Sequence, residues 1–142
     1  MRTGYLYVEN RDPAERLVRF GLTVRPPEFG GDGPARIRFV ARFSDVDAAL
    51  MQVHEELRRT LADVDRRIYR TDVETGIAAV RAAGFGARQV YLDDGLDLAA
   101  RERIEGLVQG MQTRRRRMER FIDLLGYLAL ASLVLHALAG LL

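Results

Sequence analysis

Residues 35–62, ARIRFVARFSDVDAALMQVHEELRRTLA, decide the fold. The spacing of their apolar residues changes once along the stretch, from every second residue to helical spacing. From Ala35 to Phe43 apolar residues alternate with arginine, which predicts a strand with one solvated face. Ser44 or Asp45 is then suited to cap a helix that runs to about Ala62. Apolar residues recur along that helix at helical spacing: Val46, Leu50, Val53, Leu57 and Leu61. A strand followed by an amphipathic helix predicts an α/β (α+β) domain.

Two further strands are predicted before this stretch. Gly4–Glu9 and Leu17–Val24 are rich in aromatic and branched residues, and Asn10–Pro13 predicts the turn between them. Arg25–Pro34 is dense in proline and glycine and predicts a loop. With Ala35–Phe43 these strands predict a small antiparallel three-stranded sheet with packed helices.

The predicted domain continues to residue 92. Arg67–Arg70 is a short extended piece, and Thr71 or Asp72 can cap a helix that ends near Gly84. Gln89–Leu92 is compatible with one more short strand. We therefore expect an α/β domain over residues 1–92, a linker and amphipathic helix over 93–120, and a membrane helix over 121–142.

The amino-acid composition excludes several kinds of functional site. The 142 residues contain no cysteine, which excludes disulfides, thiolate metal sites and cysteine nucleophiles. The 22 basic residues, all arginine, nearly balance 20 acidic ones, so overall charge gives little support for nucleic-acid binding. Four arginines on the predicted strands leave nucleic acid open as a partner, although solvated strand faces explain them too: Arg19, Arg36, Arg38 and Arg42.

The C-terminal segment is the most apolar part of the chain. Residues 124–142 are nineteen positions without a formal charge. At about 1.5 Å per residue, such a helix spans roughly the hydrocarbon layer of a bilayer. The sequence predicts a single-pass membrane protein with the lipid bilayer as a partner. The alternative is a core helix, which rarely needs so long an uncharged stretch.

An arginine cluster precedes this segment, and no charged residue follows Asp123. The positive-inside rule therefore places the N-terminal domain in the cytoplasm. Near anionic headgroups each arginine gains about 1 kcal/mol of attraction. The membrane-facing basic cluster comprises Arg114, Arg115, Arg116, Arg117 and Arg120.

One face of the predicted membrane helix carries small and weakly polar residues, which let another helix approach closely. This face predicts self-association or pairing with a partner helix, and chance composition explains it equally well. It comprises Gly126, Ala129, Ser132, His136, Ala137 and Gly140. His136 is either an interhelical hydrogen-bonding group or a residue near the far membrane interface.

The N-terminal strands carry two motifs, GYLYV at Gly4–Val8 and VRFGLT at Val18–Thr23. In order and spacing they resemble the opening of the GIY-YIG nuclease superfamily, in the branch with a basic residue before the Ile-Gly of the second motif. The resemblance continues through Val53-His54 and Arg67–Glu74 and covers roughly residues 4 to 83.

The resemblance implies a metal-dependent phosphodiesterase with Mg²⁺ or Mn²⁺ as cofactor. In that family a tyrosine of the first strand helps to activate water, an arginine stabilises the phosphate and a helical glutamate holds the cation. A cation and a guanidinium together neutralise charge on the phosphoryl oxygens. The positions carried over as a remnant site are Tyr5, Tyr7, Arg19, Thr23 and His54.

Two essential positions depart from the family pattern. The expected metal-binding glutamate falls on Leu50, which has no oxygen to bind a hard cation. The expected phosphate arginine falls near Gly30 and is absent, although Arg25 lies nearby. Asp47 is the one weak substitute for the metal ligand, and the helix dipole explains an acidic residue there without a metal. A solitary histidine beside Val53 and Leu57 is more often a structural residue, so a structural role is favoured for His54.

These departures argue against catalysis and against a bound cofactor. The leading hypothesis is a membrane-anchored, catalytically degenerate GIY-YIG-like domain that serves as a binding or assembly module. One alternative is an active metal-dependent nuclease at the cytoplasmic membrane face. The other is an oligomeric membrane effector or pore with a cytoplasmic sensor domain.

Overall fold

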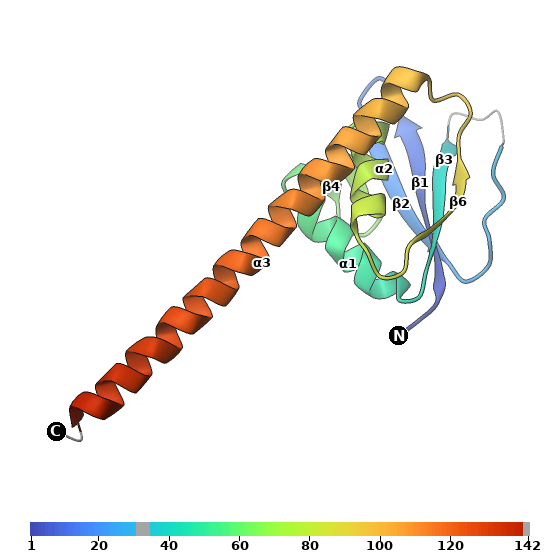
Figure 1. Cartoon of the computed structure of the whole chain (residues 1–142). Coiled ribbons are helices and arrows are strands. Elements are labelled where there is room, and N and C mark those ends of the chain that lie inside the picture. Colours follow the sequence, from blue (N-terminus) through green and yellow to red (C-terminus); the bar gives the residue numbers. More distant parts are fainter. Residues whose placement is uncertain (31–34, 141–142) are drawn as a thin grey trace. The chain divides into compact units, whose positions relative to one another are not determined.

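The computed structural model describes residues 1–30 and 35–140 (Figure 1). The chain divides into two compact units, Met1–Gln109 and Gly110–Leu142. The N-terminal unit is an α+β domain built on one antiparallel sheet. The C-terminal unit consists of the continuation of the last helix, α3 (Leu98–Gly140).

The sheet has six strands among the described residues, in the order β4-β5-β2-β1-β3-β6. Every neighbouring pair is antiparallel. The strands are β1 (Gly4–Asp12), β2 (Leu17–Thr23), β3 (Arg36–Phe43), β4 (Leu61–Asp63), β5 (Ile68–Arg70) and β6 (Arg88–Leu92). The three central strands were predicted from sequence, whereas the predicted three-stranded sheet was too small.

The missed strand β4 lies where the sequence predicted the end of a helix. Helix α1 (Val46–Leu57) stops five residues before Ala62, and a 3₁₀ turn at Arg58–Thr60 follows it. The hydroxyl of Thr60 donates to the carbonyl of Leu57 at 2.9 Å and closes the last turn. Leu61 then pairs with Tyr69 of β5, so sheet hydrogen bonds replace the helical ones that its spacing suggested.

Side-chain caps begin the three helices. Asp45 rather than Ser44 caps α1, and its carboxylate accepts from the Ala48 N–H at 3.2 Å. Asp72 caps α2 (Val73–Ala82) through the Thr75 N–H at 2.7 Å. Asp97 accepts from the Ala100 N–H at 2.8 Å at the start of α3. Each carboxylate satisfies an N–H that has no partner within the helix.

Helices α1 and α2 cover one face of the sheet and contact β1 and β3 (Figure 1). Gly76 of α2 packs closely over the sheet, where a Cβ at that position would lie 3.2 Å from Val18 and 3.4 Å from Val8. Buried side chains from the sheet and the helices form the core on this face. They include Leu6, Val8, Val18, Phe20, Phe39, Val53, Ile77, Val80, Ile104 and Val108.

The other face of the sheet, called the open face below, carries Tyr7. Tyr7 pairs with Gly21 of β2 and with Val40 of β3. Its ring lies over Gly21 so closely that a Cβ there would be 1.9 Å from the Tyr7 Cζ. Glycine is therefore required at position 21 to leave room for the aromatic ring. On the same face Phe29 stacks on Tyr91 at a centroid distance of 4.3 Å.

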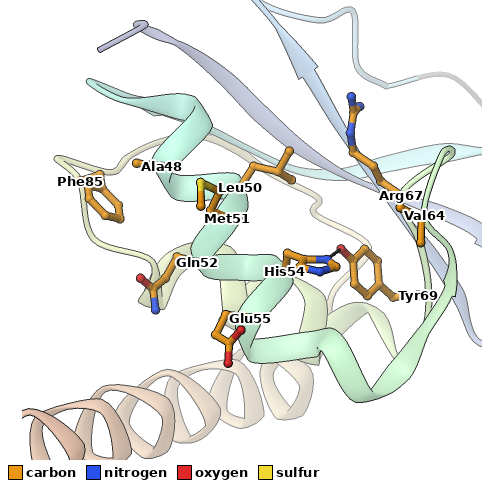
Figure 2. Close-up of a pocket in the computed structure, with 10 residues that line it drawn as sticks. All are labelled: Ala48, Leu50, Met51, Gln52, His54, Glu55, Val64, Arg67, Tyr69 and Phe85. Atoms are coloured by element: carbon orange, nitrogen blue, oxygen red, sulfur yellow. Dashed lines mark hydrogen bonds between the residues drawn. The ribbon is translucent and has the colours of Figure 1, made fainter.

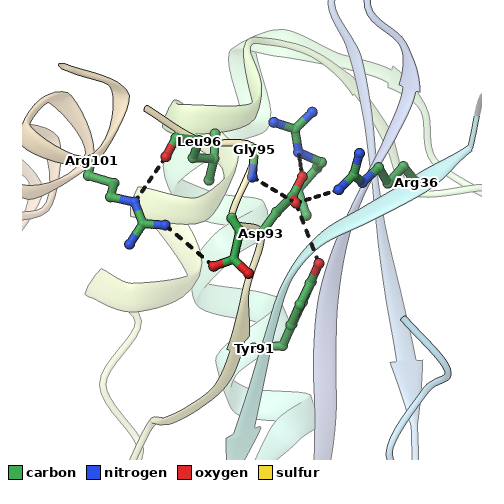
Figure 3. A network of polar contacts seen from close by, with 8 residues as sticks. Arg36, Tyr91, Asp93, Gly95, Leu96 and Arg101 are labelled. Carbon is green, nitrogen blue, oxygen red and sulfur yellow. Dashed lines mark hydrogen bonds and ion pairs between the residues drawn. The ribbon is translucent and has the colours of Figure 1, made fainter. Parts of the chain in front are cut away.

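A buried carboxylate joins β3 to the segment that follows β6 (Figure 3). Asp93 is 1% exposed and lies 2.6 Å from the Arg36 Nη2 and 2.5 Å from the Arg38 Nε. It also accepts from the Gly95 N–H at 3.1 Å. Its own N–H donates to the carbonyl of Arg38 at 2.9 Å. Two guanidinium groups and a backbone N–H thus compensate the buried charge.

Asp72 makes the stability of the domain depend on pH in the acid range. Burial alone would raise the pKa of this carboxyl, but the hydrogen bonds from Thr75 and Arg16 and the charge of Arg103 outweigh it and hold the pKa below 3.8. A depressed pKa adds stability that is fully present above the unfolded-state value and is lost as the pH falls through the folded value. We therefore expect the domain to lose stability as the pH falls below about 4.

The Asp72→Asn variant tests this assignment. We expect it to be less stable than the parent at pH 7 and to show a smaller loss between pH 5 and pH 3. The measurement is urea unfolding of the full chain in nonionic detergent, followed by near-ultraviolet circular dichroism of the tyrosines. Equal pH slopes for variant and parent would show that other carboxylates carry the acid response.

The C-terminal unit contains the one described helix that is long and apolar enough to cross a membrane. None of its most apolar window is buried. Large side chains along it stand in the open, including Leu133, which is 72% exposed, and Leu135, which is 68% exposed. The described part of the predicted span is therefore not a core helix, and residues 141–142 lie outside the described residues.

Candidate functional site

The remnant-site residues predicted from the sequence do not meet in one place. Tyr7 lies over Gly21 on the open face, and strand alternation puts Tyr5 of β1 on that face too. His54 lies on α1, and its ring contacts Tyr69, which packs edge-on against Phe20 at 5.2 Å. Phe20 belongs to the helix-covered core. The sheet thus separates His54 from Tyr5 and Tyr7.

The other two predicted positions have local partners on or near the open face. Arg19 makes an ion pair with Glu9 of β1 at 3.3 Å. Glu9 is only 8% exposed and also pairs with Arg11 at 3.2 Å. The hydroxyl of Thr23 donates to the carbonyl of Arg25 at 2.9 Å and accepts from its N–H at 3.2 Å. Thr23 therefore shapes the turn after β2.

The two positions considered for a metal ligand, Asp47 and Leu50, have other contacts in the structure. The carboxylate of Asp47 makes an exposed ion pair with Arg2 at 2.6 Å. Leu50 contributes hydrocarbon to the wall of a pocket beside His54. Across residues 1–30 and 35–140, no group of three or more His, Asp or Glu side chains is placed to hold a metal ion. The geometry thus offers no ready cation site around α1.

A pocket of about 650 Å³ lies between α1, the β4–β5 turn and the loop after α2 (Figure 2). Its size falls within the range typical of small-molecule sites. Most of its wall is hydrocarbon, with a few polar groups among it. The lining residues are Ala48, Leu50, Met51, Gln52, His54, Glu55, Val64, Arg67, Tyr69 and Phe85.

A hydrogen bond joins two of the lining residues, His54 and Tyr69. The His54 Nδ1 and the Tyr69 hydroxyl are 2.9 Å apart. Burial raises the pKa of Tyr69, an effect that the nearby Arg67 charge only partly offsets. Tyr69 therefore stays protonated at neutral pH and can donate to Nδ1. Which of the two groups donates depends on the tautomer of the imidazole.

The charged side chains at the pocket rim are directed elsewhere. Figure 2 shows the Arg67 guanidinium extending away from the His54–Tyr69 pair. Glu55 makes an ion pair with Arg58 at 3.3 Å. A ligand in this pocket would therefore meet mainly apolar surface, with His54 and Gln52 as the uncharged polar groups at its wall. This chemistry fits an uncharged, largely apolar molecule with one hydrogen-bonding group.

Tyr69 was not predicted as a site residue, although it lies within the sequence that resembles the nuclease family. No local pattern marks Tyr69 as a site residue. Its side chain faces α1 only because the short strand Ile68–Arg70 pairs with β2.

Comparisons with family models, with curated proteins and with solved structures each find no match to this chain. The resemblance to GIY-YIG nucleases therefore rests on the sequence motifs alone, and no comparison tests it.

The Tyr69→Phe variant measures what the hydrogen bond between the buried Tyr69 and the exposed His54 contributes. It removes that one hydrogen bond, so we expect a loss of about 1 kcal/mol in the free energy of unfolding. The measurement is urea unfolding in nonionic detergent. Tyr5→Phe, at a half-exposed position on the other face, is the matched control and should change stability by less than about 0.5 kcal/mol. Equal losses would contradict a specific role for the pair.

Proposed function

We propose that the chain is a single-pass membrane protein whose N-terminal domain is a cytoplasmic binding module. The observation that carries the proposal is the exposed apolar stretch of α3, which has no charged residue from Leu124 to Gly140. Burying one leucine gains about 1.5–3 kcal/mol, so a row of exposed leucines is a large cost in water and none in lipid. A helix also satisfies its backbone polar groups internally, as a bilayer requires.

The basic cluster supports the proposed orientation. The apolar stretch, residues 124–142, has no charged side chain, and five arginines precede it: Arg114, Arg115, Arg116, Arg117 and Arg120. Arg115 pairs with Glu119 at 3.2 Å, one turn away on the same helix. The excess of arginine on this side favours the cytoplasmic leaflet and contact with anionic headgroups.

Binding rather than cleavage is favoured by the separation of the remnant-site residues. A nuclease needs its water-activating group, its phosphate arginine and its metal ligand at one reacting phosphate. Tyr7 and His54 lie on opposite faces of the sheet, and Leu50 supplies no oxygen. We therefore regard the domain as a degenerate relative of the GIY-YIG nucleases in which the pocket beside His54 takes the ligand.

Helix association through α3 is a second proposed property. An added Cβ at Gly126 or at Gly140 would meet no atom within 4 Å, so the face remains free for a neighbouring helix. Ala129, Ser132 and His136 continue this face. A membrane effector assembled through such helices would use the N-terminal domain as its sensor. Crosslinking in detergent should give dimers or larger species that Gly140→Leu weakens, and a strict monomer would contradict association.

Membrane extraction tests the anchor. The full chain should stay with membranes after carbonate washing, and Leu133→Arg with Leu135→Arg should release it. The control is Arg58→Leu with Arg59→Leu, which alters exposed residues of the N-terminal domain and should leave the chain in the membrane. Release of the parent chain by carbonate would contradict the anchor.

Because the chain has no cysteine, orientation can be tested with one introduced thiol. We expect Glu15→Cys, at an exposed site of the domain, to react with a membrane-impermeant maleimide only after the cells are opened. Labelling in intact cells would reverse the assigned orientation.

Two assays test binding against catalysis. The probe 1-naphthol, an apolar molecule with one hydroxyl, should bind the full chain in detergent, and His54→Ala or Leu50→Arg should weaken it several-fold. Asp47→Ala, outside the pocket, should not. Incubation with DNA and RNA in Mg²⁺ or Mn²⁺ should give no cleavage above background. Cleavage that Tyr7→Phe abolishes would instead establish the nuclease.

A further inference from the structure

A second hollow of about 330 Å³ lies at the end of the sheet near the β4–β5 turn and is lined mainly by arginine. Three segments that are distant in sequence meet there: the end of β1, the start of β2 and the turn before β5. Its lining is Arg11, Arg19, Asp65, Arg66, Arg67 and Ile68. The domain therefore brings four arginines to the wall of a space that could hold a small ligand.

Glu9 holds two of these arginines side by side. Its carboxylate, which is 8% exposed, pairs with the Arg11 Nη1 at 3.2 Å through Oε1 and with the Arg19 Nη1 at 3.3 Å through Oε2. A guanidinium has five N–H donors, so each of these contacts leaves several donors unused. Glu9 thus reduces the freedom of both side chains without consuming their hydrogen-bonding capacity.

Arg67 enters the hollow from a fixed backbone. Its N–H donates to the carbonyl of Val64 at 3.2 Å, and its own carbonyl accepts from the Phe20 N–H at 3.1 Å. The backbone there adopts a φ of 54°, a conformation in which arginine is uncommon. Its guanidinium points away from His54 and Tyr69 (Figure 2). The turn therefore directs this charge toward the arginine hollow.

Charge at this site is in excess. Four guanidinium groups are accompanied by three carboxylates: Glu9, Asp65 and Asp63, the last at 3.9 Å from the Arg66 Nε. One positive charge is left over, and two arginines already have a fixed direction. Guanidinium groups match the oxygen geometry of phosphate and bind it through paired N–H donors.

We propose that the arginine hollow binds the phosphate group of a small phosphorylated ligand. This site shares only Arg67 with the His54 pocket, so its failure would leave the proposed function standing. Phosphate could come from a soluble molecule or from a lipid headgroup, and the same four arginines would recognise both.

Calorimetry on the full chain in nonionic detergent tests the proposal with two probes. The first is inorganic pyrophosphate in solution, and the second is phosphatidic acid in mixed micelles. Arg67→Asn suits the backbone at this position and should weaken binding about tenfold, as expected for loss of a charged hydrogen bond. Arg11→Gln should weaken it as well. Arg25→Gln makes the same charge change at an exposed position outside the hollow and should alter binding less than twofold.

The outcomes distinguish a soluble phosphate ligand, a lipid headgroup and the absence of specific binding. Pyrophosphate binding that depends on Arg67 supports a soluble phosphate ligand, and binding of phosphatidic acid alone with the same dependence supports a headgroup. Near-ultraviolet circular dichroism confirms that each variant is folded. The proposal is overturned if neither probe binds, or if Arg67→Asn, Arg11→Gln and Arg25→Gln weaken binding equally, because the attraction would then be non-specific.

Discussion

Replacing Asp93 with alanine is expected to lower the free energy of unfolding by about 3 kcal/mol, the lower end of the range measured when one partner of a buried ion pair is removed, because the arginines left behind are partly exposed. Asp93 is 1% exposed and compensates the side chains of Arg36 and Arg38, which are 39% and 20% exposed. Without it the two guanidinium groups would repel each other, although their exposed parts remain screened by water. The Gly95 N–H would also lose its acceptor.

The neighbouring Asp94 provides a matched control. Its side chain is fully exposed and lies 3.8 Å from the Arg101 Nη2, so its ion pair should contribute little. Asp94→Ala should change stability by less than about 0.5 kcal/mol in the same urea unfolding experiment. If Asp93→Ala and Asp94→Ala are equally mild, the network around Asp93 does not hold β3 to the segment before α3.

The second large effect concerns the contact between Tyr7 and Gly21. Gly21→Ala places a Cβ 1.9 Å from the Tyr7 Cζ, so the ring must move or the strands must separate. Overpacking of this kind costs about 1–3 kcal/mol, and the upper end is expected because both strands are central in the sheet. The measurement is again urea unfolding of the full chain in detergent.

Two further variants distinguish this clash from a general effect of replacing glycine. Gly106→Ala adds a Cβ that meets nothing within 4 Å on a helix, and it should leave stability unchanged or raise it by up to about 1 kcal/mol. Combining Gly21→Ala with Tyr7→Ala should cost less than the sum of the single changes, since the clash is removed. Simple additivity would mean that the ring does not lie over Gly21.

Local periodicity and capping chemistry predicted much of this fold. The three central strands have strong alternation or strand-forming composition, and Asp45 and Asp72 lie where helical spacing begins. The exposed apolar part of α3 likewise followed from an uncharged run. The sequence did not predict β4, because Leu61 continues the helical spacing of α1 and its pairing with Tyr69 is a tertiary interaction. The equally short β5 lies within the extended piece predicted at Arg67–Arg70.

The site was harder to predict than the fold. Tyr7 and His54 were grouped because a family pattern lists them in order, but strand alternation and helix placement put them on opposite faces. The Asp93 network and the arginine hollow depend on the register of β3 against β6 and on the turn before β5. Neither register nor turn position follows from spacing alone, so these clusters appear only once the chain is folded.

The ends of the sheet have a consequence for the membrane anchoring proposed above, because copies anchored in one bilayer would meet at raised local concentration. A long bare strand at a sheet margin would invite its copies to join through the backbone. Here one margin is β4, only three residues long, and the other is β6, whose first residues Arg88 and Gln89 are exposed. These short or polar edges disfavour edge-to-edge pairing of neighbouring domains through backbone hydrogen bonds. Any specific assembly of the domains then depends on contacts between side chains.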